Sequence, residues 1–162
     1  MGLSFQEIAI RLITATVLTG LIGIEREVRK KPAGVRTNAL IGLGAAVVTM
    51  CGFLIAAQMQ GAAADRIASI VVEGIGFLGA GVIIQSSGAV HGLTTAATMW
   101  VVAGIGIACG FGFYEVAAMA TLIVLVLLAI FGPLDARLMG NEEERQSHWP
   151  FNKKKVDPTT PR

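Results

Sequence analysis

Five apolar runs, each close to the length of a membrane-spanning helix, constrain this chain more than any other feature of its sequence. A helix needs about 17 to 25 residues to cross the hydrocarbon core of a bilayer. The runs cover residues 5–24, 39–57, 67–84, 96–113 and 116–132. Hydrophobic residues make up 54% of the chain and charged residues 15%, which is too apolar for an ordinary soluble domain. The sequence therefore predicts an all-α polytopic membrane protein, a bundle of about five transmembrane helices with short connections.

The basic residues predict how this bundle is oriented. Of the 13 Lys and Arg residues, five lie between the first two runs and six follow the last run. Cytoplasmic flanks of membrane proteins carry an excess of Lys and Arg, and an odd number of spans puts the two termini on opposite sides. We therefore expect the N-terminus outside and the C-terminus in the cytoplasm. The basic residues are explained by topology, and we expect no nucleic-acid partner.

Composition also divides the chain into two parts. Residues 1–133 form the predicted transmembrane domain, and we expect Pro133 to end the fifth helix. Residues 134–162 combine acidic and lysine runs with three prolines and are too polar to bury a core. They are predicted to be a disordered cytoplasmic tail.

One carboxylate, Glu73, lies inside the third apolar run. A charged side chain in lipid is costly unless it has a partner or is protonated. At 1.5 Å rise per residue, Arg11 in the first run and Glu73 in the third both lie about 9 Å below the same membrane surface. We therefore expect an intramembrane ion pair between Arg11 and Glu73. The alternatives are that Arg11 extends to the headgroups beside a neutral Glu73, or that Glu73 carries a proton or cation.

Glycines are concentrated in the third and fourth runs. Small residues allow transmembrane helices to approach closely. The letters of residues 74–79 also spell the GxGxxG of dinucleotide-binding folds, but that motif requires a preceding strand and a later acidic residue that are missing from this context. We therefore predict that these glycines are helix-packing positions: Gly74, Gly76, Gly79, Gly81, Gly106 and Gly110.

The segments at the predicted cytoplasmic edge suggest a polar site. Glu25 and Arg36 stand at helix ends, although a charged loop is also explained by topology alone. Thr37 or Asn38 is a candidate N-cap for the second helix. Thr94 or the threonine that follows it can cap the fourth helix. The free N–H groups of that helix, together with Arg36, could hold a phosphate or a lipid headgroup.

Four segments, in this order, resemble the membrane domain of the MgtC/SapB family of bacterial inner-membrane proteins. They are GLIGIERE, PAGVRTNALIGLGAA, DRIASIVVEGIGFLGAGVI and GLTTAATMWVVAGIGIACGFG. The resemblance covers roughly residues 20 to 112 and adds Arg26 and Thr37 to the candidate polar site, because both occupy signature positions of the family. The residues after the last run are too few for the soluble domain that many members carry, so we expect the membrane domain only.

The resemblance implies a plasma-membrane protein linked to magnesium limitation, acid stress or survival inside host cells. Members are named as magnesium transporters, yet they are also regarded as regulators that bind other membrane proteins, including cation-pumping ATPases and the ATP synthase. The resemblance leaves association with Mg²⁺ open and transfers no chemical role to any single residue.

Two functions remain from the sequence. The first is a non-enzymatic regulator that binds itself or another membrane protein through its glycine-rich faces. The alternative is a transporter or channel for Mg²⁺ or another cation that uses Glu73. We expect no enzyme and no cofactor, because the sequence shows no nucleophile arrangement and no ligand spacing for a metal cluster.

Overall fold

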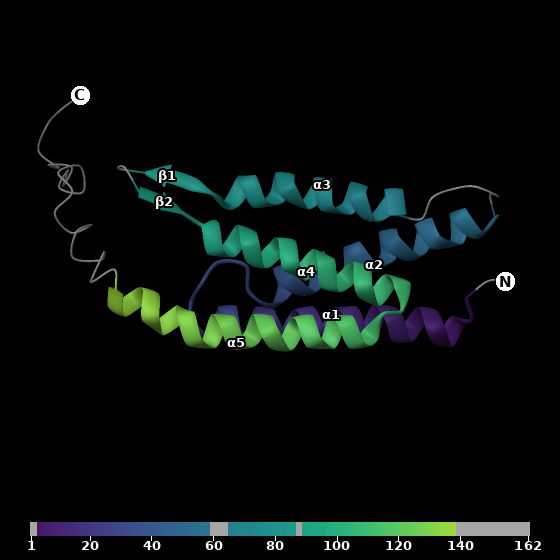
Figure 1. Ribbon diagram of the computed structural model, residues 1–162, viewed down its shortest axis with the longest axis horizontal. Coiled ribbons are helices and arrows are strands. Elements are labelled where there is room, and N and C mark those ends of the chain that lie inside the picture. Colours follow the sequence, from purple (N-terminus) through teal and green to yellow (C-terminus); the bar gives the residue numbers. More distant parts are fainter. Residues whose placement is uncertain (1–2, 59–64, 87–88, 139–162) are drawn as a thin grey trace, which may run out of the picture. The chain divides into compact units, whose positions relative to one another are not determined.

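The computed structural model describes residues 3–58, 65–86 and 89–138, and it is a helical protein with one short hairpin (Figure 1). Its elements are α1 (Phe5–Val28), α2 (Val35–Gln58), α3 (Asp65–Val82), β1 (Ile84–Ser86), β2 (Ala89–His91), α4 (Leu93–Phe111) and α5 (Tyr114–Leu138). Within the described part, four helices are long and apolar enough to cross a membrane: α1, α2, α4 and α5. The stretch Ser69–Val82 of α3 is apolar but shorter. The all-α membrane architecture expected from the five apolar runs is confirmed.

Two local expectations about these elements are wrong. The connection between α3 and α4 contains an antiparallel hairpin, in which Ser86 pairs with Ala89, where we expected only a loop. In addition, α5 continues past Pro133 to Leu138. A proline removes its own hydrogen bond to the preceding turn, but the residues after it can keep helical backbone angles.

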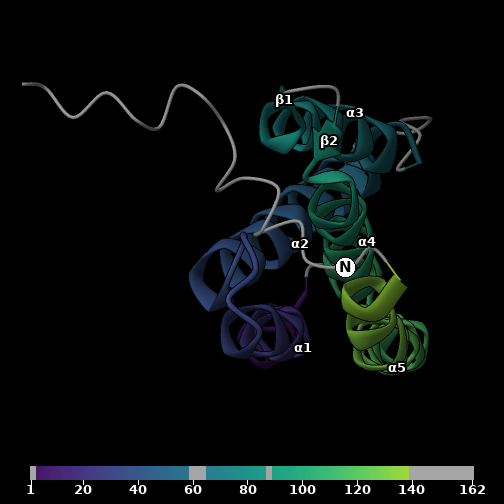
Figure 2. The same ribbon diagram turned by 90° about the vertical axis from the view of Figure 1, so that its left-hand side faces the viewer.

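The chain divides into two units, residues 1–126 and residues 127–162, and residues 139–162 of the second lie outside the described part. The predicted disordered tail therefore falls almost entirely outside the described residues. Within the first unit, Figure 2 shows α3 on one side of α4 and α1 on the other. The helix α2 packs against both α1 and α4. The apolar segment of α4 is 56% buried, whereas that of α5 is only 11% buried.

Small residues bring the central helices together. A Cβ atom added to Gly106 of α4 would lie 2.4 Å from the carbonyl oxygen of Gly42 in α2. One turn later, a Cβ on Gly110 would lie 2.7 Å from the Cβ of Thr49. The far side of Gly42 is filled by Thr19 of α1, whose hydroxyl donates to the Ala15 carbonyl, 2.7 Å away. Because a glycine provides one side of each of these contacts, the helices approach closely, and α2 packs tightly between α1 and α4.

Candidate functional site

Charged residues at the end of α1 form two different contacts. Arg29 Nε lies 2.5 Å from Glu25 Oε1, an ion pair between residues one helical turn apart. Arg26, which is only 5% exposed, instead points toward α4. Its Nη2 donates a hydrogen bond of 2.8 Å to the Thr95 hydroxyl in the first turn of that helix. Arg26 therefore ties the end of α1 to the beginning of α4.

Several buried polar atoms of α1 and α2 have no hydrogen-bond partner within the described residues. They include Arg26 Nε, Glu25 Oε2 and Asn38 Oδ1. Asn38 is fully buried, and its amide nitrogen donates to the carbonyl oxygens of Ala33 and Gly34, the latter at 3.0 Å. Asn38 thus fixes the loop that precedes α2, and its Oδ1 is a buried acceptor without a partner among the described residues.

The first turns of α2 and α4 are not capped as expected. Neither Thr37 nor Asn38 is the N-cap of α2, because the helix already begins at Val35. The Val35 N–H donates to Glu27 Oε2 at 3.1 Å, so a carboxylate from α1 caps α2. At α4 the N-cap is Gly92, with φ +89° and no side-chain cap bond. Without a Cβ, Gly92 fits against the Val82 carbonyl, where a threonine would collide.

The structure separates the residues predicted to form one polar site. Arg26 forms the α1–α4 tie, Glu25 pairs with Arg29 at the end of α1, and Thr94 is exposed next to Thr95. Arg36 and Thr37 instead line a pocket of about 450 Å³ between the end of α1 and the beginning of α2. Lys30 and Lys31 line the same pocket but were not among the predicted site residues. Arg29 was not predicted as a site residue either. Its position four residues after Glu25 is the sequence pattern that could have indicated their ion pair.

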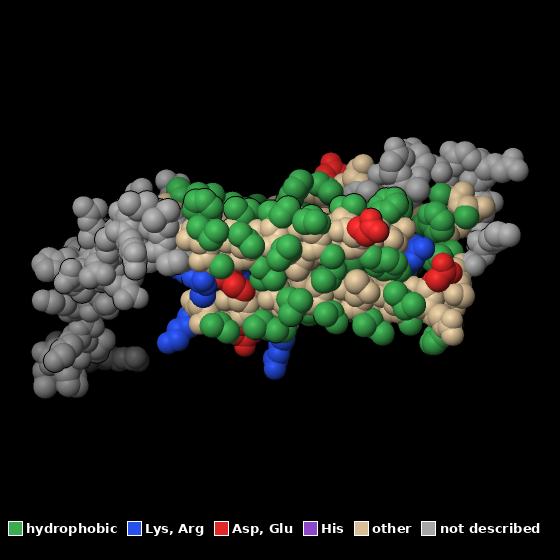
Figure 3. Space-filling view, turned by 60° about the horizontal axis from the view of Figure 1, so that its bottom comes forward, with side chains coloured by type: hydrophobic (Ala, Val, Ile, Leu, Met, Phe, Trp, Pro, Cys, Tyr) green, Lys and Arg blue, Asp and Glu red, His purple; other side chains and the backbone are tan. Residues whose placement is uncertain are grey.

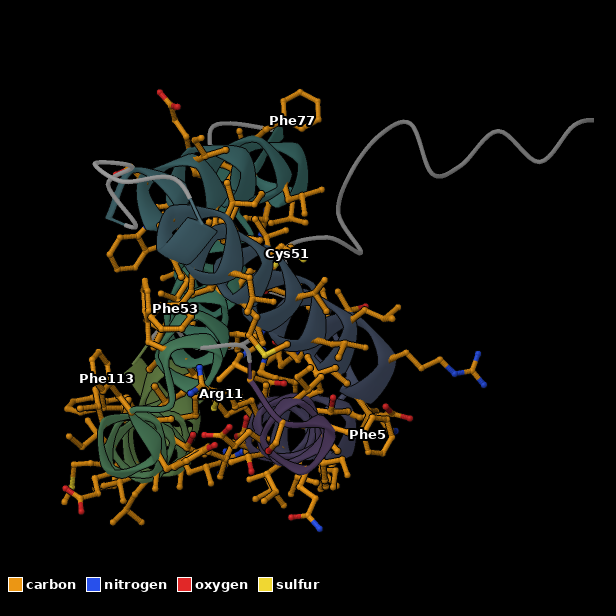
Figure 4. The ribbon with its side chains drawn as sticks, turned by 90° about the vertical axis from the view of Figure 1, so that its right-hand side faces the viewer. Phe5, Arg11, Cys51, Phe53, Phe77 and Phe113 are labelled. Atoms are coloured by element: carbon orange, nitrogen blue, oxygen red, sulfur yellow. The ribbon has the colours of Figure 1, made fainter. Side chains whose placement is uncertain are left out.

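Arg11 and Glu73 are not brought together in this chain. Arg11 Nη1 donates to the Gly110 carbonyl at 2.7 Å, and the guanidinium lies 6.0 Å from the centre of the Phe53 ring. Figure 4 shows Arg11 directed toward the neighbouring helices, on the side of Phe53. Glu73 is exposed on α3, which packs against α4 and, less extensively, α2. Matching depth in the membrane did not produce a contact, because α1 and α3 pack on different sides of α4.

The glycines of α3 also differ from those of α4. A Cβ on Gly74, Gly76 or Gly81 would meet no atom within 4 Å, and Gly79 alone faces α4, at ordinary contact distance from Ala96. Phe77, on the same outer face, is 81% exposed and points away from the other helices in Figure 4. In the described part of the chain, α3 therefore presents an uncovered face that combines a carboxylate, glycines and an aromatic ring.

No group of three or more His, Cys, Asp or Glu side chains suited to a metal ion occurs within the described residues. The arrangements that the structure does offer are a basic pocket beside α2, able to attract anions, and a carboxylate on an apolar helix face. A carboxylate in that setting can accept a hydrogen bond or an ion pair from a group outside the chain.

Comparison with known proteins identifies the family. The sequence profile of the MgtC family matches residues 12–137. This chain belongs to the MgtC family. It is 42% identical over 145 residues to the Escherichia coli K12 protein named "Putative magnesium transporter YhiD". It is also 47% identical over 116 residues to Protein MgtC of Salmonella typhimurium LT2 and 42% identical over 123 residues to Protein MgtC of Brucella abortus.

These matches differ in how much of each relative they cover. The YhiD alignment covers 86% of this chain and 67% of the relative. The MgtC alignments cover 72% and 76% of this chain but only 48% and 50% of the relatives, so the chain spans about half of their length. No solved structure matches this chain. With its four apolar helices of spanning length, the chain is a multi-pass membrane protein of the MgtC family.

Proposed function

We propose that this protein is a bacterial inner-membrane protein of magnesium homeostasis and stress or virulence adaptation that regulates other membrane proteins by binding them. It acts without catalysing a reaction. Family membership and the name of the YhiD relative support the link to magnesium. The partner is a second copy of the chain or another membrane protein, such as a cation-pumping ATPase or the ATP synthase.

The exposed position of Glu73 on α3 carries this proposal. Glu73 lies near the middle of an 18-residue helix, about 12 Å along the axis from Asp65. A charged side chain facing hydrocarbon costs at least about 2.5 kcal/mol. Gly74 and Gly81 flank it on the exposed side, and glycines allow another helix to approach closely. A transmembrane helix packed on this face would cover the carboxylate and provide it with a donor.

Photocrosslinking in membranes tests this interface. A photo-reactive phenylalanine analogue at position 77 is expected to capture a membrane protein, which mass spectrometry would identify. The same analogue at Leu122, which is 57% exposed on α5, is the matched control for an apolar surface that lacks a carboxylate. Glu73→Gln should weaken the adduct formed from position 77. Equal capture from both positions, or capture from Leu122 alone, would contradict the proposal.

A cation transporter is the alternative, and the same carboxylate favours it. Mg²⁺ is commonly bound by one or two carboxylates while it retains part of its water shell. The test is magnesium flux into liposomes that contain the purified protein and a magnesium-sensitive dye. Glu115→Gln, which removes an exposed acid at the start of α5, is the control. Flux that persists in Glu115→Gln and disappears in Glu73→Gln would establish transport and replace the regulatory proposal.

A further inference from the structure

The pocket between α1 and α2 contains a surplus of positive charge that the proposed regulatory function does not use. Three basic residues line it, Lys30, Lys31 and Arg36, and none of them forms an ion pair within the described residues. Glu27 is the acidic residue of the lining, and its carboxylate is already bound to the N–H of Val35. Three basic groups and one acid leave a net charge of about +2 around a hollow of about 450 Å³.

The loop that carries these lysines is held in a defined shape. Lys30 and Ala33 both have left-handed backbone angles, φ 54° and 59°, which are unfavourable for residues with a Cβ. Backbone bonds from Lys30 N to Glu27 O and from Lys31 N to Arg26 O fix the turn, at 3.0 and 2.9 Å. Buried Asn38 holds the other end of the loop. Strained residues persist where the surrounding structure determines them, which is common at ligand sites.

The beginning of α2 adds hydrogen-bond donors to this charged pocket. The Val35 N–H is taken by Glu27, and the Asn38 N–H donates to Gly34 O at 3.1 Å. Arg36 and Thr37 are also lining residues, and their backbone N–H groups have no acceptor within the described residues. Free N–H groups in the first turn of a helix favour anions. Figure 3 shows basic side chains gathered mainly at the end of the molecule where α1 and α2 connect.

We propose that this pocket binds a phosphate group, with Lys30, Lys31 and Arg36 providing positive charge and the first turn of α2 providing N–H donors. The pocket lies directly after the apolar run of α1, at the expected edge of the bilayer. Two sources can supply this chemistry there, the headgroup of an anionic phospholipid or a soluble phosphate. Basic residues at a membrane surface attract anionic lipids in the same way.

The test uses the full chain and compares two charge-matched variants. One variant carries Lys30→Gln, Lys31→Gln and Arg36→Gln, and the control carries Lys153→Gln, Lys154→Gln and Lys155→Gln in the tail. Native mass spectrometry would measure retention of phosphatidylglycerol against phosphatidylcholine, and inorganic phosphate would be added as a competitor. The loop variant is expected to bind phosphatidylglycerol at least about tenfold more weakly, with the tail variant unchanged.

The outcomes separate the two ligand sources. Retention of phosphatidylglycerol that phosphate does not displace identifies a lipid headgroup, whereas displacement identifies a site that also accepts soluble phosphate. Arg36→Gln alone, at an exposed position, provides a second variant if the triple variant does not fold. An equal loss in the loop and tail variants would show only unspecific charge attraction and would overturn the proposal. If the unmodified protein bound neither phosphatidylglycerol nor phosphate, the proposal would be overturned as well.

Discussion

Arg11 shows how one side chain obtains its partner in a low-dielectric setting. Its guanidinium donates to the Gly110 carbonyl near the end of α4, where the last turn of a helix has carbonyls without intrahelical donors. A Cβ on the C-cap Gly112 would lie 3.2 Å from Arg11 Nη2, so the glycine leaves the room that the guanidinium occupies. Arg11 is therefore a cap for α4 provided by α1.

Replacing Arg11 by Met is expected to destabilise the folded protein by about 1 to 2 kcal/mol, because a charge-assisted hydrogen bond to the end of α4 is lost. Glu73→Gln should not destabilise the protein, since Glu73 is exposed and the substitution removes no contact with the described residues. Unfolding of both single variants and the double variant in detergent would measure this. Additive effects are expected, and a coupling energy above about 1 kcal/mol would show that the two residues do form a pair.

The position of Arg11 in the sequence predicted its depth but not its neighbour. Spacing along a helix gives the height of a residue, and Arg11 and Glu73 do lie at matching heights by that measure. Which side chain Arg11 contacts depends on how the helices are arranged around α4, and residue spacing along one helix gives no information on that arrangement. Glu7, one helical turn before Arg11 in the sequence, caps α1 and accepts a hydrogen bond of 3.1 Å from Ser4 N. The S-x-x-E pattern of residues 4–7 was the signal for that capping box.

At the scale of elements, glycines in two helices have opposite surroundings. The glycines of α4 include positions pressed against α2, whereas most of those in α3 face outward. The apolar runs predicted where helices would form, because length and hydropathy decide that. They could not distinguish a glycine at a helix contact from one on an open face. The hairpin was missed although the Ser-Gly dipeptide in this connection is typical of turns.

Gly106→Ala and Gly104→Ala form a matched pair in α4. A Cβ at Gly106 would overlap the Gly42 carbonyl and come within 2.8 Å of the Ala45 Cβ, whereas at Gly104 it would meet nothing within 4 Å. Gly106→Ala should therefore destabilise the protein by about 1 to 3 kcal/mol through overpacking. Gly104→Ala should be neutral or slightly stabilising, because alanine is the better helix former. Thermal unfolding in detergent would compare them, and equal stability of the two variants would contradict the packing of α4 on α2.

At the scale of the whole molecule, the distribution of charge predicts how the protein lies in the membrane. The basic loop between α1 and α2 contains Arg29, Lys30 and Lys31, whereas the start of α1 carries Glu7. Retaining basic segments in the cytoplasm is the general rule for membrane proteins. The loop and the N-terminus should therefore lie on opposite sides of the bilayer, separated by α1.

Single-cysteine labelling in intact cells tests this orientation. Cys51 and Cys109 would first be replaced by Ala, because Cys51 is exposed and could react. In that background, Ser4→Cys should react with a membrane-impermeant maleimide added outside, and Lys30→Cys should react only after the membrane is permeabilised. Both positions are exposed on the protein, so the bilayer alone would account for a difference in labelling. The reverse pattern would place the phosphate pocket in the outer leaflet, and the excess of basic residues would then not have set the topology.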